Sequence, residues 1–142
     1  MKKILMACLL SGLVPLLSYS QSTAETAIRT VMNEQVKYWN EGNLEAFMQT
    51  YWKSDSVMFI GSHGITYGWQ NTLNSYKKGY PDTAAMGKLN FNLLEVKRLS
   101  PVYFFVTGKW HLSRSIGDAE GYFTLLFQKV KNKWVIVKDH SS

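Results

Sequence analysis

Asp139 and His140 have the residue types of a general-base pair, in which a carboxylate orients an imidazole. They lie in a stretch with strand-like alternation, where neighbouring side chains point to opposite faces unless a bulge intervenes. We therefore expect Asp139 and His140 to face opposite sides of the sheet. Burial would raise the pKa of Asp139 and make it an acid or base; the alternative is a hydrogen bond to Thr124 or a strand-end cap.

The histidines do not have the spacing of metal ligands. His63, His111 and His140 fall in one loop and two different strands, without a His-x-x-x-His step and with few carboxylates nearby. We expect no metal and no cofactor.

Arg114 ends the run Lys109-Trp110-His111-Leu112-Ser113-Arg114, in which alternation places Trp110 and Arg114 on one face of a strand. A guanidinium at that position could bind an anionic ligand at the mouth of a pocket. The alternative is a surface ion pair with Asp118 or Glu120.

The composition indicates one small globular domain. Of 142 residues, 46% are hydrophobic, 14% aromatic and 18% charged, which favours a packed core over disorder. A single cysteine excludes both an internal disulfide framework and a cysteine-rich zinc site.

The first 20 residues have the pattern of an export signal. Lys2 and Lys3 precede an apolar run over 4–17, and small residues follow up to Ser20, where we expect cleavage. The run is too short for a membrane span, which needs about 20 residues. Cys8 lies near the start of the run, whereas a lipidated cysteine normally follows it, so we favour plain export to the periplasm or medium over lipidation.

Removal of residues 1–20 would leave 122 residues, a single domain over 21–142, and a net charge of +4 in place of +6. The remaining basic residues are dispersed along the chain. This distribution is typical of solvated faces and does not indicate a nucleic-acid partner.

Two helices are predicted first. Ser22 and Glu25 have the capping-box spacing, so we expect a helix from 23 to 40, and Asn43 can cap a second helix. Their buried stripes are predicted to be Ile28, Val31, Met32, Gln35, Val36 and Trp39 in the first and Leu44, Phe47, Met48 and Tyr51 in the second.

The rest of the chain predicts an α+β domain. After a short apolar strand over 57–60, a second over 65–67 and a helix over 69–78, residues 80–87 form the longest irregular connection, a plausible lid. The period then changes to two, which predicts strands over about 88–99, 102–114, 120–130 and 134–139. Helices followed by antiparallel strands place the helices on one face of the sheet.

The last two strands have a predictable register. If Val130 pairs with Lys133 across a two-residue turn, Phe127 lies opposite Ile136 and Thr124 opposite Asp139. Both faces of this hairpin are then apolar, although helices can cover only one. We expect the second face to be a homodimer interface made by Phe123, Leu125, Phe127, Trp134 and Ile136.

Several segments resemble the nuclear transport factor 2-like superfamily, which includes ketosteroid isomerases and SnoaL-like polyketide cyclases. The resemblance covers about 24–142 and rests on 38–47, on Gly68 before the third helix, and on 121–127 with 134–142. The last two segments are similar to a branch described as a domain of unknown function. The resemblance implies a cone-shaped, curved antiparallel sheet with three N-terminal helices on its concave face.

The same resemblance implies a pocket between the helices and the sheet. Its expected ligand-binding residues are Gln35, Trp39, Tyr51, Met58, Ile60, Trp69, Tyr76, Trp110, Tyr122, Thr124 and Asp139. A ketosteroid isomerase-like site would need a base at Ile60, a phenol at Gln35 and an acid at Thr124. These three residues cannot perform that chemistry, so steroid isomerisation is not expected.

Three functions remain. The first is an exported domain that binds a small apolar or aromatic molecule. The second is a polyketide-cyclase-like or dehydratase-like enzyme in which Asp139 is the best candidate for moving a proton. The third is a dimeric module that binds another protein through the apolar sheet face. The absence of a paired acid and base favours the first function, and whether the protein is an enzyme stays open.

Overall fold

The computed structural model describes residues 16–142, with side chains from residue 23 onward. Cys8 and most of the predicted export signal lie outside this part of the chain. Within residues 16–142, none of the helices combines the length and apolarity needed to cross a membrane.

The first two helices form a hairpin. Helix α1 (Leu16–Asn40) and helix α2 (Leu44–Met48) are joined by a turn in which Gly42 has φ +74°. Asn43 caps α2 as predicted, because its side-chain oxygen accepts a hydrogen bond from the Ala46 amide at 2.9 Å. The predicted start of α1 at Ser22 is wrong. Residues 16–21 are also helical, so the amide groups that Ser22 would cap have carbonyl partners one turn earlier.

Two short strands and two helices follow. Strands β1 (Met58–Gly61) and β2 (Gly64–Tyr67) form a hairpin, and helix α3 (Trp69–Gly79) begins after Gly68, as expected. The predicted irregular segment contains a further helix, α4 (Thr83–Met86). Asp82 caps α4, because its carboxylate accepts a hydrogen bond from the Ala85 amide at 2.8 Å.

Four long strands complete the sheet: β3 (Lys88–Ser100), β4 (Tyr103–Ser113), β5 (Ala119–Val130) and β6 (Lys133–Ser141). The strand order is β2-β1-β6-β5-β4-β3. All neighbours are antiparallel except β1 and β6, so the sheet is mixed, whereas a purely antiparallel sheet was expected. The parallel pair places β1 beside the strand that carries Asp139.

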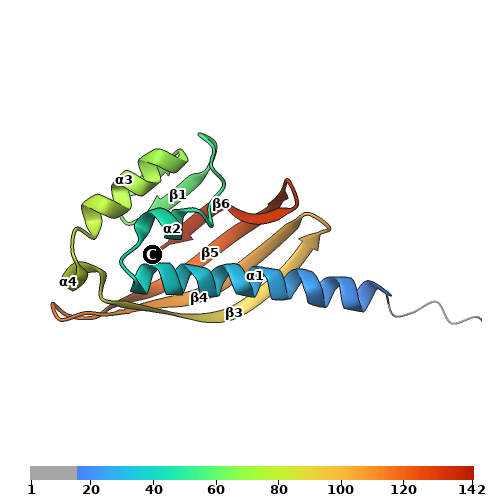
Figure 1. Ribbon diagram of the computed structural model, residues 1–142, viewed down its shortest axis with the longest axis horizontal. Helices are drawn as coiled ribbons and strands as arrows, with labels where there is room; N and C mark the ends of the chain where they lie inside the picture. Colours follow the sequence, from blue (N-terminus) through green and yellow to red (C-terminus); the bar gives the residue numbers. More distant parts are fainter. Residues whose placement is uncertain (1–15) are drawn as a thin grey trace, which may run out of the picture.

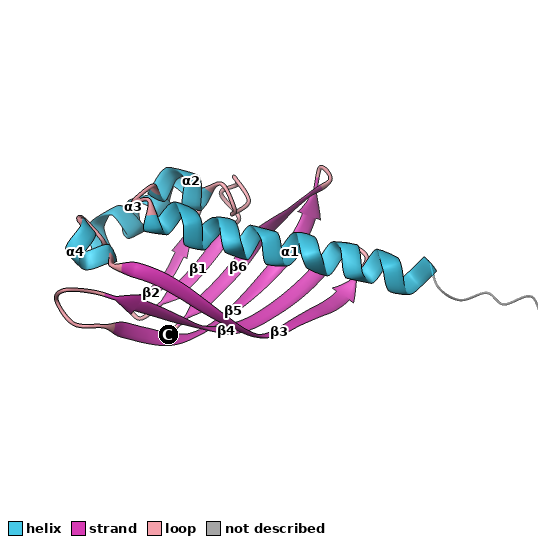
Figure 2. Ribbon diagram, turned by 60° about the horizontal axis from the view of Figure 1, so that its bottom comes forward, coloured by secondary structure: helices cyan, strands magenta, loops and turns pink. Residues whose placement is uncertain are grey.

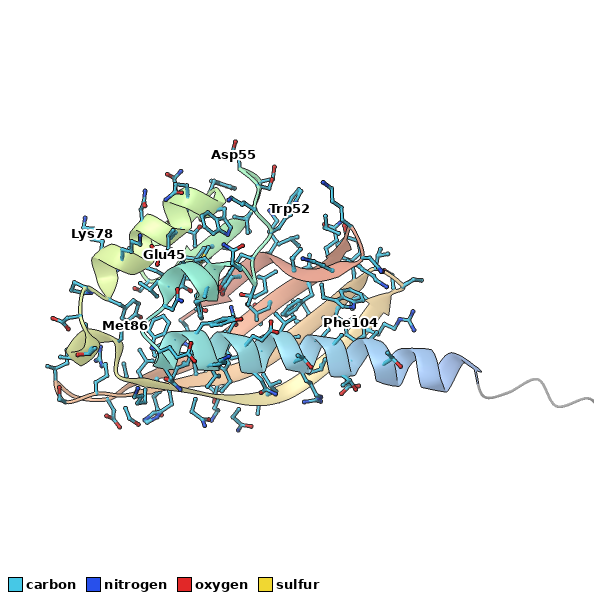
Figure 3. All side chains as sticks on the ribbon, in the orientation of Figure 1. Glu45, Trp52, Asp55, Lys78, Met86 and Phe104 are labelled. Carbon is cyan, nitrogen blue, oxygen red and sulfur yellow. The ribbon has the colours of Figure 1, made fainter. Side chains whose placement is uncertain are left out.

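The helices cover one face of the curved sheet, and the opposite face carries no helix in the described part of the chain (Figures 1 and 2). The α+β architecture with helices on the concave face is therefore confirmed. The core lies between α1 and the sheet and runs along this helix, from Met86 at one end to Phe104 towards the other (Figure 3); both side chains are buried.

A β-bulge divides the pairing of β5 with β6 into two segments with different registers. Phe127 pairs with Ile136 as predicted, but the next pair is Leu126 with Lys138, so Val137 is an extra residue in β6. Asp139 consequently lies opposite Leu125, and the predicted pairing with Thr124 is wrong. One inserted residue moves every later side chain of β6 to the other face.

The predicted dimer face is part of the chain's own core. Phe123, Leu125, Phe127 and Ile136 are all buried under the helices, and the ring of Trp134 packs edge-on against Phe104 at 5.2 Å. The assignment of these five predicted residues to an interface is therefore wrong. Alternation identified two apolar faces, but it could not say which of them the helices cover.

Candidate functional site

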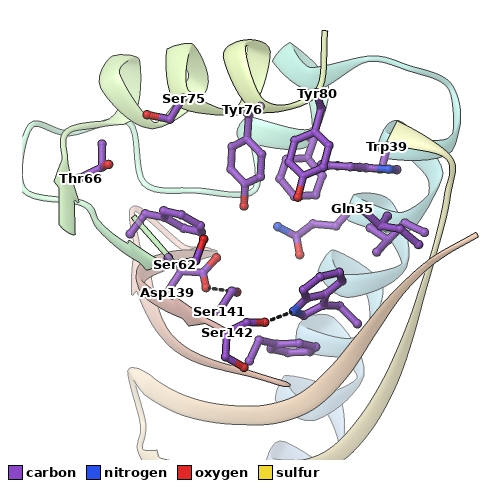
Figure 4. A pocket seen from close by; sticks show the side chains of 18 of the residues that line it. Gln35, Trp39, Ser62, Thr66, Ser75, Tyr76, Tyr80, Asp139, Ser141 and Ser142 are labelled. Carbon is purple, nitrogen blue, oxygen red and sulfur yellow. Dashed lines mark hydrogen bonds between the residues drawn. The ribbon is translucent and has the colours of Figure 1, made fainter. Parts of the chain in front are cut away.

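A cavity of about 450 Å³ lies between the helices and the concave face of the sheet (Figure 4). Its inner wall is made of buried side chains from α1, α2 and the strands, namely Gln35, Trp39, Phe47, Tyr51, Leu89, Leu112, Phe123, Leu125 and Asp139. Its rim is made of exposed residues of the β1–β2 turn and α3, namely Ser62, His63, Gly64, Ser75 and Gly79. The cavity is thus apolar inside and polar at its opening.

Asp139 is the one acidic side chain among the described residues that line this cavity. Its side chain is 4% exposed. Tyr51 donates its hydroxyl hydrogen to Oδ2 at 2.5 Å, and Ser141 donates its hydroxyl hydrogen to Oδ1 at 2.8 Å. Each carboxylate oxygen has a second lone pair that these two bonds do not use, so a bound molecule can still contact the carboxylate.

Burial raises the pKa of Asp139 from 3.8 to about 6. The hydrogen bonds from Tyr51 and Ser141 and the nearby His140 oppose this shift, but desolvation is larger. Because this pKa lies near neutrality, both the acid and the carboxylate are populated under ordinary conditions, and the group can accept or release a proton.

Two tyrosines next to Asp139 remain protonated. Burial and the charge of Asp139 raise the pKa of Tyr51 and of Tyr76 well above 10. Their hydroxyl oxygens lie 3.4 Å apart. Tyr76 extends its hydroxyl group into the cavity, as does Tyr80 (Figure 4). The cavity therefore contains phenol donors beside a single titratable carboxylate.

Gln35 is held by the helical hairpin. Its side chain is 1% exposed, and its amide nitrogen donates to the Thr50 hydroxyl at 2.9 Å, which in turn donates to the Phe47 carbonyl at 2.7 Å. The Gln35 amide is directed into the cavity (Figure 4). This arrangement gives the inner wall a fixed neutral polar group.

Aromatic rings form the wall between α1 and α3. Trp39 contacts Tyr80 at 4.8 Å and Phe47 at 5.4 Å between ring centroids, and Tyr76 contacts Phe59 at 5.5 Å. The Trp39 indole also donates a hydrogen bond to the Met86 carbonyl at 3.1 Å. Edge-to-face packing and this hydrogen bond hold the rings in one arrangement, so the wall is preorganised.

The structure brings part of the predicted set to the cavity: Gln35, Trp39, Tyr51, Tyr76, Trp110 and Asp139. It excludes the remaining predicted residues, which are Met58, Ile60, Trp69, Tyr122 and Thr124. Trp69 is buried elsewhere, where its indole donates to the Met48 carbonyl at 2.7 Å. Tyr122 and Thr124 alternate with buried Phe123 and therefore lie on the outer face.

Met58 and Ile60 are excluded by the pairing of β1 with β6. Phe59 lies beside Asp139 and faces the cavity, so its two neighbours face outward next to Lys138 and His140. Alternation within a four-residue apolar strand gives no indication of which residues face inward. Phe123 and Leu125 also line the cavity, although they were assigned to a dimer interface, and Phe59, Phe91 and Ser141 were absent from the predicted set.

This finding changes which of the three ketosteroid isomerase positions line the cavity. Ile60 and Thr124 lie on the outer face, and of the three positions Gln35 alone lines the cavity. The inward neighbours, Phe59 and Leu125, have no ionisable group either. The ketosteroid isomerase positions therefore lack the base and the acid, whether Ile60 and Thr124 or their inward neighbours are considered.

His140 and Asp139 point to opposite faces, as expected, because His140 is exposed beside Ile60. They form no dyad. The predicted hydrogen bond from Asp139 to Thr124 is wrong, since Tyr51 and Ser141 are its partners. The residues that the structure describes contain no cluster of three or more metal-ligating side chains.

The fold and site together define a class: a small α+β domain whose curved sheet and helices enclose an aromatic cavity with one buried carboxylate. A family model described as a SnoaL-like domain matches residues 28–142. The chain therefore belongs to the SnoaL-like domain family of the nuclear transport factor 2-like superfamily, as the sequence motifs indicated.

Solved structures agree with this assignment. An NTF-2 like protein of unknown function from Shewanella oneidensis MR-1 is 40% identical, with a TM-score of 0.79 over 85% of this chain and 98% of that one. LinA has a TM-score of 0.73 at 12% identity, over 88% of each chain. A ketosteroid isomerase-like protein from Erwinia carotovora atroseptica has a TM-score of 0.65 at 15% identity, over 82% of this chain and 93% of that one.

The last two similarities establish the fold alone. A comparison with curated protein sequences finds no match.

Proposed function

We propose that this protein binds a small, largely apolar or aromatic molecule in the cavity between α1, α3 and the sheet. The observation that carries the proposal is the cavity itself, whose volume of about 450 Å³ lies within the range of small-molecule sites. Its walls are aromatic and preorganised, and Gln35, Tyr76 and Asp139 place a few polar atoms where they can orient a ligand. Burial of apolar ligand surface supplies the affinity.

The test uses N-phenyl-1-naphthylamine, an uncharged aromatic probe that fluoresces in apolar sites. We expect one probe to bind per chain. Ser75 lies at the rim, so S75W places an indole over the opening and should raise Kd by about tenfold or more. The matched control is N74W, because Asn74 is exposed on the same helix but does not line the cavity. Equal Kd values for S75W and N74W would contradict binding in this cavity.

A second candidate function is proton transfer by Asp139. It is favoured by a specific observation: the carboxylate is buried in the cavity wall, each oxygen has one unused lone pair, and burial raises the pKa of Asp139 to about 6. The Tyr76 and Tyr80 hydroxyl groups can donate to a carbonyl oxygen of the same bound molecule. The reaction class is removal and return of a proton next to a carbonyl group.

The probe for this activity is 2-tetralone in heavy water. The Asp139 carboxylate removes a proton from carbon to leave an enolate, and a deuteron is then returned to that carbon. We expect exchange, followed by NMR, to accelerate as the pH rises through 6 and then to level off. D139N should abolish the acceleration, whereas D55N, which changes an exposed carboxylate, should retain it. Exchange that survives in D139N would exclude Asp139 as the base.

Two further properties are proposed. The positive, apolar and small-residue pattern of residues 1–20 supports export with cleavage near Ser20. The uncovered outer face of the sheet supports a homodimer, because Ile65, Tyr67 and Tyr122 are each more than half exposed there. An unrelated protein partner on this face is the alternative.

A further inference from the structure

Arg114 brings a permanent positive charge to the cavity. It follows β4 directly, is half-buried, and is the one arginine or lysine among the described residues that line the cavity. The remaining lining is aromatic, aliphatic or neutral polar, apart from Asp139 and His63. The guanidinium is therefore a fixed positive charge that a ligand entering the cavity would meet.

The local backbone holds the Arg114 side chain in place. Its Nε donates to the Gly117 carbonyl at 2.7 Å within the β4–β5 loop. Its aliphatic stem packs against Gly87, which has φ +58°; a Cβ at Gly87 would lie 2.5 Å from Cγ of Arg114. Glycine at position 87 therefore allows this segment to approach the chain at Ser113 and Arg114 closely. The contact with Gly87 and the hydrogen bond to Gly117 position the guanidinium before any ligand binds.

No acidic side chain neutralises Arg114 in the part of the chain that the structure describes. The predicted ion pair with Asp118 or Glu120 is not formed. Asp118 instead accepts the backbone amide hydrogen of Arg114 at 3.0 Å, and its other carboxylate oxygen contacts Nε2 of His111 at 3.2 Å. Of the five N–H donors of the guanidinium, the one on Nε is used and four remain.

The charge lies close to the aromatic wall. Burial raises the pKa of Tyr80, and the positive charge of Arg114 partly opposes that rise. Trp110 and Arg114 both line the cavity, as the alternation of the strand predicted. A partly desolvated cation with unused donors, placed beside an apolar cavity, is a site for an anion.

We infer that Arg114 binds the carboxylate or sulfonate group of an organic anion whose aromatic or aliphatic body occupies the cavity. The inference rests on the proposed binding function and narrows its ligand class to amphipathic anions. It also gives the ligand an orientation. The buried Asp139 lines the same cavity, so the anionic end lies at Arg114, away from this carboxyl group, and the uncharged end of the ligand lies towards Asp139.

The experiment compares two fluorescent probes with the same aromatic framework. One is 1-anilinonaphthalene-8-sulfonate, and the other is N-phenyl-1-naphthylamine, which lacks the sulfonate. We expect the wild-type protein to bind the sulfonate probe more tightly, and R114Q to weaken it about tenfold while leaving the uncharged probe unchanged. R114K keeps the charge but loses the planar fork, so it should retain part of the preference. R98Q is the control, because Arg98 does not line the cavity.

The outcomes separate the two proposals. Equal affinity of R114Q and wild type for the sulfonate probe, with the uncharged probe still bound one per chain, would overturn the role of Arg114 and leave the binding function intact. Equal weakening of both probes in R114Q would overturn it as well, since it would indicate a purely structural residue. If neither probe binds stoichiometrically to the wild type, the proposed function itself fails. Circular dichroism confirms that each variant is folded.

Discussion

At the residue scale, burial of the carboxyl group determines how readily Asp139 gains or loses a proton. Water is nearly excluded from its carboxyl group, and the two hydrogen bonds from Tyr51 and Ser141 compensate only part of the desolvation. The result is a pKa of about 6, which is higher than that of a solvated aspartate. The same burial that makes Asp139 a possible base therefore also makes its ionised form unfavourable in the folded state.

Because ionised Asp139 is unfavourable in the folded state, we expect the free energy of unfolding to depend on pH in the wild type, and we expect D139N to remove this contribution. The folded pKa is raised, so the folded state holds the proton more tightly than the unfolded chain between pH 4 and 6. The wild type should therefore lose stability as the pH rises through this window. A rise from 3.8 to about 6 corresponds to about 3 kcal/mol at pH 7.

The free energy of unfolding can be measured with urea for the wild type and D139N at about pH 4, 5, 6 and 7. Groups that titrate alike in both proteins cancel in the difference of their unfolding free energies. We expect that difference to shift in favour of D139N as the pH rises. Parallel curves for the two proteins would show that Asp139 has an ordinary pKa.

At the scale of elements, short sequence patterns were sufficient for most of the helices and strands. The cap at Asn43, the two-residue turn at Lys131 and Asn132, and the change to period two near residue 88 each depend on neighbours in the chain. Helix α4 was missed, although Asp82 before a short helix-forming segment is a readable cap.

The bulge in β6 shows where such local rules stop. The register of the β5–β6 hairpin is predictable up to Phe127 and Ile136, because the turn sets it. Beyond that pair, Val137 adds one residue and brings Asp139 to the cavity side. In the sequence, this valine resembles any other strand residue. Its effect becomes visible only when β6 is placed between β5 and β1.

At the scale of the whole molecule, the sheet has two apolar faces with different roles. The concave face packs against the helices and forms the cavity, whereas the outer face leaves Ile65, Tyr67 and Tyr122 exposed. Leu126 lies on the outer face as well, half-buried between Phe105 and Lys138 on the neighbouring strands. Exposed apolar side chains on a sheet face that no helix covers are typical of an interface.

We therefore expect a homodimer whose interface contains Leu126. Sedimentation velocity should show the wild type as a dimer, and L126E should shift it towards monomer, because a buried unpaired carboxylate is unfavourable in an apolar interface. Q70E is the control, since Gln70 is exposed on α3 on the helical side of the molecule. A wild-type monomer at high micromolar concentration would contradict the dimer, and a dimeric L126E would move the interface away from this face.

The sequence by itself determined the α+β class, the order of the long elements and the family resemblance, and the resemblance implied Gln35, Trp39 and Tyr51 as site residues. The class and the order of the elements depend on periodicity, capping and turn residues, which act between positions close together in the chain. The tertiary structure decided which sheet face the helices cover. It thereby moved Met58, Ile60, Tyr122 and Thr124 out of the site, and it brought in Phe59, Phe123 and Leu125.

The physical reason is that strand alternation defines two sets of side chains without saying which one is inside. That choice depends on the total burial achieved when helices and sheet pack together, and a single bulge can exchange the two sets along part of a strand. The cavity is likewise a property of the packed whole, because its residues come from three helices, all six strands and the β4–β5 loop, and no local pattern connects them.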